Sequence, residues 1–105
     1  MSFRRSKLKA DAAPSRRNER RDRAEARAAT APLRKKAKDA EARLAKLTAE
    51  RAKIEARLAD PAIYADGGAA QVTAAQTRLA AIGRETEAAE LEWLEAAEAL
   101  DAASA

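Results

Sequence analysis

The sequence predicts an all-α fold in which two long helices form an antiparallel coiled-coil hairpin. Ala, Glu, Lys, Leu and Arg make up 73 of the 105 residues, a composition typical of long helices and coiled coils. Apolar residues recur at alternating steps of three and four along residues 33–58 and again along residues 72–100, which is the spacing of a coiled-coil seam. Between them lies the turn-like stretch ADPAIYADGG, residues 59–68, where we expect the chain to fold back.

The N-terminal segment, residues 1–31, is basic and has no large apolar stripe. We expect residues 1–14 to be a flexible, disordered arm, with a helix start at Pro14 and Ser15. Residues 16–31 favour helix by composition but contain no large apolar side chains that could pack against another element. The sequence therefore predicts a segment that is helical only under some conditions, such as when something binds it.

The first helix of the hairpin, residues 33–58, is expected to begin near Leu33, because Thr30 is a candidate N-cap and Pro32 suits a first turn. The alternative is a helix that continues from the basic segment through a kink. Its seam positions are Leu33, Ala37, Ala40, Leu44, Leu47, Arg51, Ile54 and Leu58. Arg51 either sets the register as a polar seam residue or lays its stem over the seam with its charge in water.

The joint, residues 59–68, carries the residues that a tight connection needs. Asp60 can cap a helix that starts with Pro61, and the two glycines that follow at 67 and 68 allow backbone angles that Ala resists. Ile63 and Tyr64 are apolar residues in a polar turn, and we expect both to fold over the helix ends and seal the tip.

The second helix of the hairpin is expected over residues 69–102, where the seam spacing continues. Its seam positions are Val72, Ala75, Leu79, Ile82, Thr86, Ala89, Trp93, Ala96 and Leu100. An antiparallel register in which paired residue numbers add to 126 aligns both seams without a skip, so it places Ile54 beside Val72 and Leu33 beside Trp93. Trp93 is then a core plug at the open end of the hairpin; the alternative is an exposed anchor for a partner.

Composition excludes several classes of protein. Only 14 residues are Leu, Ile, Val or Phe, and 32 are Ala, so the chain has a thin seam and no thick core. The absence of Cys and His excludes disulfides, zinc fingers and imidazole catalysis. We found no Gly-rich phosphate loop and no nucleophile with a base beside it, so no enzyme, small-molecule substrate or cofactor is expected. No apolar run approaches the roughly 20 residues of a membrane span, which indicates a cytoplasmic protein without membrane contact.

Charge is divided unevenly along the chain. Residues 1–36 hold 13 basic and 4 acidic side chains, whereas residues 37–105 hold 8 basic and 13 acidic ones. Basic segments of this kind neutralise phosphates, so the pattern predicts binding to RNA or DNA with little sequence preference. The candidate nucleic-acid-binding residues are Arg16, Arg17, Arg20, Arg21, Arg23, Arg27, Arg34, Lys35 and Lys36. The alternative is a solvated linker whose charge is partly paired with the acidic end of the second helix.

Two stretches resemble a known module. They are PLRKKAKDAEARLAKLTAERAKIEARLADPAIYAD, residues 32–66, and ELEWLEAAEAL, residues 90–100. A helix that opens near P-L-R, a turn with a D-P-x-x-Y element and a closing W-L-x-x-x-E-x-L segment are similar to the C-terminal coiled-coil domain of ABC-F family ATP-binding proteins of the Uup/YheS type. The resemblance covers about 75 residues, and the turn and the Trp segment are its most specific parts.

The resemblance implies a non-catalytic helical hairpin that contacts nucleic acid, such as ribosomal or other structured RNA or DNA, for a ribosome-associated ATPase. Nothing in the chain resembles a Walker A loop or a signature motif, so ATP hydrolysis is not implied. The chain is then either the tail of a longer protein or a free-standing relative of that tail. The alternative function is a protein-interaction module that docks on a parent ABC ATPase or on another helical partner.

Overall fold

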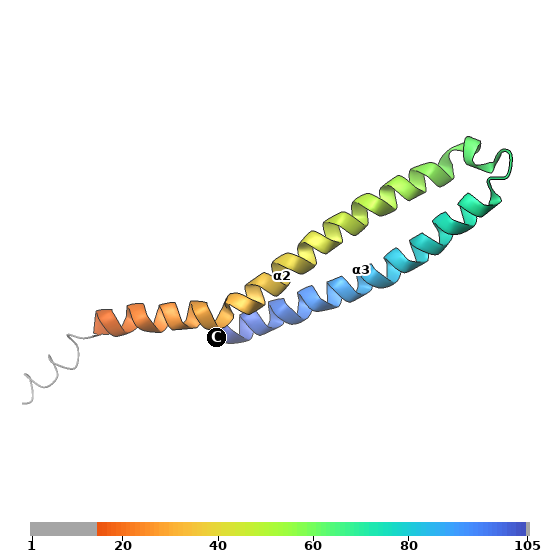
Figure 1. Cartoon of the computed structure of the whole chain (residues 1–105). Helices are drawn as coiled ribbons and strands as arrows, with labels where there is room; N and C mark the ends of the chain where they lie inside the picture. The colour runs from red at the N-terminus through yellow and green to blue at the C-terminus, as the bar shows by residue number, and fades with distance from the viewer. Residues whose placement is uncertain (1–14, 105) are drawn as a thin grey trace, which may run out of the picture. The chain divides into compact units, whose positions relative to one another are not determined.

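A computed structural model describes residues 15–104 and consists of two long helices joined by a short 3-10 helix (Figure 1). Helix α2 spans Ser15–Ala59, η1 spans Pro61–Tyr64 and α3 spans Ala69–Ser104. The described residues contain no β-strand. The predicted all-α class is confirmed, and the joint and the second helix begin and end within two residues of the predicted bounds.

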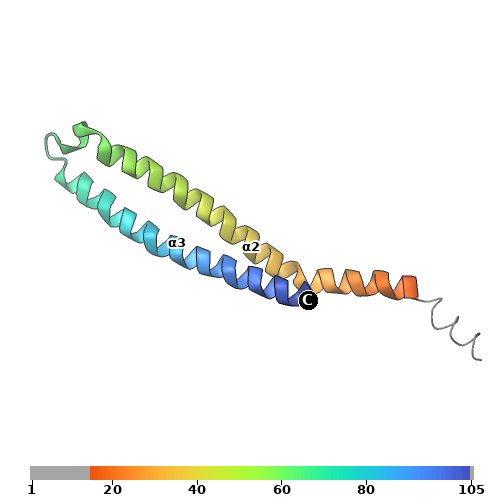
Figure 2. The same ribbon diagram turned by 180° about the vertical axis from the view of Figure 1, so that it is seen from behind.

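The chain divides into two compact units, residues 1–32 and residues 33–105. The second unit contains the hairpin: residues 33–59 of α2 run antiparallel to α3, and both views show the two helices side by side as far as the turn (Figures 1 and 2). The first unit contributes residues 15–32 of α2. The arm predicted over residues 1–14 lies outside the described residues.

Helix α2 begins at Ser15, so the expected start near Leu33 is wrong and the continuous alternative is the observed one. Thr30 does not act as an N-cap, because its hydroxyl donates to the carbonyl of Ala26 at 3.0 Å, one turn earlier in the same helix. Pro32 is exposed inside α2 and removes one backbone N–H from the ladder. The alanines before it and the run LRKK after it favour helix strongly, and this propensity outweighs the stop signal that Thr30 and Pro32 provide together.

The core of the hairpin is a narrow seam with one buried residue per heptad on each helix. The buried residues are Ala40, Leu47 and Ile54 on α2 and Ala75, Ile82, Ala89 and Ala96 on α3. All seven lie at seam positions predicted from the sequence. The larger ones gather near the turn, where Leu58 and Leu79 pack against the cluster of Leu47, Ile54, Ala75 and Ile82.

The register of the two helices differs from the predicted one. The indole N–H of Trp93 donates to the carboxylate of Glu41 at 2.9 Å, and Glu41 follows the predicted partner of Trp93, Leu33, by eight positions along α2. Arg43 and Glu92 form an ion pair at 3.3 Å in the same region. Heptad spacing repeats along both helices and is compatible with several offsets, so it could not select this register by itself.

Trp93 is also wrongly predicted as a core plug. Its side chain is 38% exposed, and the buried positions on either side of it in α3 are the small residues Ala89 and Ala96. Alanine lets two helix backbones approach closely, and an indole ring does not fit between them. The ring therefore lies at the edge of the seam, where its N–H has a carboxylate partner.

The turn is built largely as the sequence predicts. The Asp60 carboxylate accepts a hydrogen bond from the Ala62 N–H at 3.0 Å and caps η1, which begins with Pro61. Ile63 is buried, as expected. Tyr64 is not: it is 60% exposed, and its hydroxyl donates to the carbonyl of Leu58 at 2.7 Å, satisfying an acceptor at the end of α2.

The two glycines of the turn are needed for different reasons, which predicts different costs of substitution. Gly67 has φ +74° with open space around it, so Gly67→Ala should lower the free energy of unfolding by about 1 kcal/mol. A Cβ at Gly68 would lie 1.7 Å from the carbonyl oxygen of Ile63, so Gly68→Ala must displace backbone and should cost about 2 kcal/mol or more. Urea unfolding followed by circular dichroism measures both values, and equal losses would contradict this account.

The seam predicts a second contrast, between buried and exposed large side chains of α3. Ile82 is 0% exposed, so Ile82→Ala should lower the free energy of unfolding by about 2–5 kcal/mol. Leu91 is 55% exposed on the same helix, so Leu91→Ala should change it by no more than about 0.5 kcal/mol. The same urea titration measures both variants. A loss for Leu91→Ala as large as that for Ile82→Ala would mean that the seam is misplaced.

Candidate nucleic-acid interface

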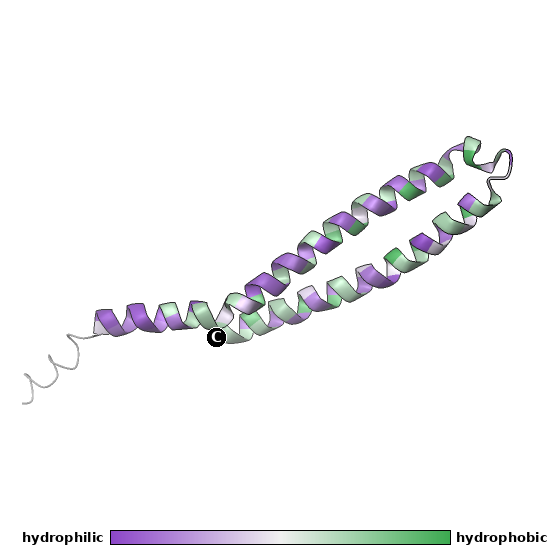
Figure 3. Cartoon of the chain, viewed as in Figure 1, coloured by the Kyte–Doolittle hydropathy of each residue, from purple (hydrophilic) through white to green (hydrophobic). Residues whose placement is uncertain are grey.

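The segment of α2 before Pro32 is dominated by arginine. Residues 15–31 contain six Arg and three acidic residues and no aromatic side chain. Almost every residue of this segment is exposed, and the ribbon at the beginning of α2 is mostly hydrophilic in Figure 3. Its charge is therefore available to solvent and to charged ligands.

The helical conformation sorts these charges onto different faces. Arg16, Arg20, Arg23 and Arg27 follow one another at steps of four, three and four, so they share one face, here named the arginine face. Arg17 lies about a quarter turn from this face and Glu19 lies along its edge, whereas Arg21, Asp22 and Glu25 lie on the other side of the helix by the same geometry. Within residues 15–104, neither Arg16, Arg20 nor Arg23 makes an ion pair.

The three remaining candidate residues, Arg34, Lys35 and Lys36, lie in the hairpin unit and are exposed. Lys35 bonds to Asp39 one turn later at 3.0 Å, and Lys36 lies 3.7 Å from Glu95 of α3. The two lysines are thus partly neutralised within the hairpin. The arginine face belongs to the other unit.

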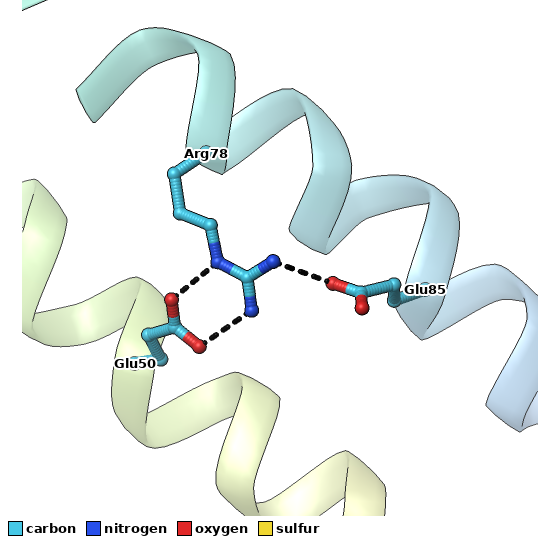
Figure 4. A network of polar contacts seen from close by, with 3 residues as sticks. All are labelled: Glu50, Arg78 and Glu85. Atoms are coloured by element: carbon cyan, nitrogen blue, oxygen red, sulfur yellow. Dashed lines mark hydrogen bonds and ion pairs between the residues drawn. The ribbon is translucent and has the colours of Figure 1, made fainter. Parts of the chain in front are cut away.

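Further ion pairs join the two helices of the hairpin. Arg78 of α3 holds Glu50 of α2 in a two-point contact through Nε and Nη2, the latter 2.7 Å from Oε1 (Figure 4). Its Nη1 also donates to Glu85 of α3 at 3.0 Å. These side chains are about two-fifths exposed. A planar guanidinium that binds a carboxylate at two points fixes its position along the seam better than a single contact does.

The Arg78 network shifts the protonation equilibria of its members. The hydrogen bonds from Arg78 lower the pKa of Glu50 below its ordinary value of 4.5, the positive charge of Arg78 adds to this, and partial burial opposes it. The bond to Glu50 likewise raises the pKa of Arg78, with a smaller contribution from Glu85. At neutral pH Glu50 is therefore an ionised carboxylate beside the Arg78 cation.

The hairpin contributes a groove that the sequence did not predict. It has a volume of about 460 Å³ and is lined by Glu50, Lys53, Ile54, Arg57, Gln71, Ala74, Ala75 and Arg78. Lys53 and Arg57 form no ion pair within the described part of the chain. Only the packing of α3 against α2 brings these two bases beside Gln71. The sequence alone shows only that Lys53 and Arg57 are four residues apart and therefore share a face of one helix.

Comparison with known families matches residues 28–98 to the model described as the ABC transporter C-terminal domain. The chain belongs to the ABC transporter C-terminal domain family. The match confirms the resemblance that residues 32–66 and 90–100 indicated. No curated protein and no solved structure matches the chain.

The ABC transporter C-terminal domain match covers the turn and most of the hairpin, but not the arginine-rich start of α2. Arg16, Arg20, Arg23 and Arg27 all precede residue 28, so the family by itself carries no information about them. The groove with Lys53 and Arg57 lies within the match. Among the helices of residues 15–104, none has the length and apolar content needed to cross a membrane.

The lowered pKa of Glu50 predicts how stability depends on pH. A carboxylate with a lower pKa in the folded state stabilises that state above its unfolded pKa, and the contribution is lost as the pH falls through the folded value. The wild-type chain should therefore be more stable than Glu50→Gln at pH 7, and this difference should shrink once the pH falls below 4.5. Thermal unfolding of both chains across pH 3 to 7 measures it.

Glu55→Gln is the matched control, because Glu55 is exposed on the same helix and forms no ion pair with another described residue. The difference in thermal stability between Glu55→Gln and the wild type should vary less with pH than the difference between Glu50→Gln and the wild type. A difference for Glu50→Gln that stays constant down to pH 3 would show that the Arg78 contact does not stabilise the fold through charge.

Proposed function

We propose that the chain is a non-catalytic module that binds nucleic acid through the arginine face of α2, with the hairpin as its folded carrier. The observation that supports this most strongly is that Arg16, Arg20 and Arg23 share one exposed helix face without internal ion pairs. Arg34, Lys35 and Lys36 add positive charge further along α2. The ligand is structured RNA, ribosomal RNA included, or DNA, recognised through its phosphates.

The physical basis is neutralisation of phosphate charge. The arginine face extends for about 16 Å at about 1.5 Å per residue, and duplex DNA carries about one charge per 1.7 Å of its axis, so each guanidinium has phosphates within reach. A guanidinium binds phosphate at two points. Because residues 15–31 contain no aromatic side chain, base stacking is absent and the binding is expected to tolerate many sequences.

A second candidate function is docking on an ABC ATPase or on another helical protein. One observation favours it: Leu91 and Leu94 of α3 remain 55% and 48% exposed. Exposed apolar patches that are rimmed by polar residues mark protein-interaction sites. The two functions use different units of the chain and do not exclude each other.

Replacement of Arg16, Arg20 and Arg23 by Gln tests nucleic-acid binding. Each phosphate contact on duplex DNA contributes about −0.9 to the slope of log K against log salt concentration. The triple variant should therefore bind duplex DNA at least about tenfold more weakly at low salt, with a slope shallower by about 2 to 3. Fluorescence anisotropy with labelled duplex DNA and with a structured RNA, over a salt titration, measures both quantities.

Replacement of Lys46, Lys53 and Arg57 by Gln is the matched control, because it removes the same charge from exposed positions of the hairpin. It should weaken binding less than the arginine-face variant and change the slope less. If the Lys46, Lys53 and Arg57 variant weakens binding more than the arginine-face variant does, the interface is the groove with Lys53 and Arg57. If the wild-type chain binds neither nucleic acid at low salt, the proposed function is wrong.

A further inference from the structure

Two large apolar side chains stay exposed on the outer face of α3. Leu91 and Leu94, here named the leucine patch, are 55% and 48% exposed. They lie three residues apart and therefore on one face of the helix. Ala89 and Ala96, the nearest seam residues, are buried against α2, and Leu91 lies close to the opposite side of the helix by the same geometry. The hairpin itself thus leaves this face uncovered.

Carboxylates surround the leucine patch. Residues 85–105 contain seven acidic side chains and no Lys or Arg. Three of these carboxylates are used within the hairpin: Glu85 by Arg78, Glu92 by Arg43 and Glu95 by Lys36. The other four make no ion pair with another described residue, and they are Glu87, Glu90, Glu98 and Asp101.

The unpaired carboxylates are placed at both ends of the patch. Glu87 lies one turn before Leu91 and Glu98 one turn after Leu94, so both share its face. All four unpaired carboxylates are exposed. A short apolar surface between two acidic ends is complementary to a helix that has apolar residues in its middle and bases at matching positions.

We infer that the outer face of α3 from Glu87 to Asp101 docks a lysine- or arginine-rich amphipathic helix of another protein. The partner's apolar residues cover Leu91 and Leu94, and its bases pair with the four unpaired carboxylates. The result is a three-helix arrangement in which α3 is covered on both sides. This inference rests on the second candidate function and is independent of nucleic-acid binding.

Two other occupants fit this face less well. A second copy placed with its own leucine patch on this one would bring carboxylates against carboxylates, because the segment after Arg84 has no base. The arginine-rich residues 15–31 of a second copy have suitable charge but no apolar side chain larger than Ala. They would leave both leucines uncovered.

The patch consists of only two leucines, so charge and apolar contact must act together. Affinity for a single helix is expected in the micromolar range, with an association rate that falls as salt is added. Removing the leucines alone or the carboxylates alone should each weaken binding by a measurable amount. This gives the proposal two separate tests on the same surface.

The experiment uses the full chain labelled with ¹⁵N and a synthetic helical peptide with leucines at steps of three and four on one face and lysines elsewhere. Titration should shift the backbone amide signals of residues 87–101 more than those of the rest of the chain. Leu91→Ser with Leu94→Ser should weaken peptide binding at least tenfold. Glu87→Gln with Glu98→Gln should weaken it severalfold and reduce its dependence on salt.

The matched control is Ala45→Ser with Ala52→Ser, which places serine at two exposed positions of α2 and should leave peptide binding unchanged. Circular dichroism shows whether each variant keeps its helix content. A second peptide with serine in place of every leucine tests charge alone and should bind at least tenfold more weakly than the first.

Several outcomes would overturn the inference. One is equal binding of the two peptides, which would mean that charge alone attracts them. Another is unchanged binding by the Leu91→Ser, Leu94→Ser variant. A third is a concentration-dependent dimer of the free chain that this variant abolishes, since the occupant would then be a second copy. Replacement of Arg16, Arg20 and Arg23 by Gln should leave peptide binding intact, so failure of the nucleic-acid proposal is recognisable separately.

Discussion

The close approach of two helices over an alanine-rich seam is the constraint on which the hairpin depends. Four of the eight buried hydrophobic residues among residues 15–104 are alanine, and each buries little apolar area compared with Leu or Ile. Such a seam is stable only when the backbones are near enough for small side chains to fill the space between them. Larger residues such as Trp93 must then lie at its edge.

The seam is not equally strong along its length. Leu47, Ile54 and Ile82 gather toward the turn, where Ile63 is also buried. At the other end the buried residues are Ala40, Ala89 and Ala96, supported by exposed ion pairs of the kind that contribute little in water. The free energy of local opening should therefore be lowest at the open end, which is also where α3 carries its exposed leucines and unpaired carboxylates.

The charged residues of the described chain fall into two groups, those that form ion pairs within the hairpin and those that form none. Arg78, Arg43 and Lys36 each pair with a carboxylate of the hairpin, and these contacts neutralise part of the acidic end. Arg16, Arg20 and Arg23 have no such role within the described residues. Unpaired charges of opposite sign thus lie on different units of the chain.

Local sequence chemistry determined the helical class, the position of the turn and the seam positions, because heptad spacing, Asp60–Pro61 and the turn glycines act over a few residues each. It also identified the exposed arginines. Only the tertiary structure decided the register, since a repeating spacing fits several offsets and the choice depends on contacts such as Arg78 with Glu50 and Trp93 with Glu41. The groove with Lys53 and Arg57 and the exposure of Leu91 and Leu94 follow from that packing, because burial depends on which face of α3 meets α2.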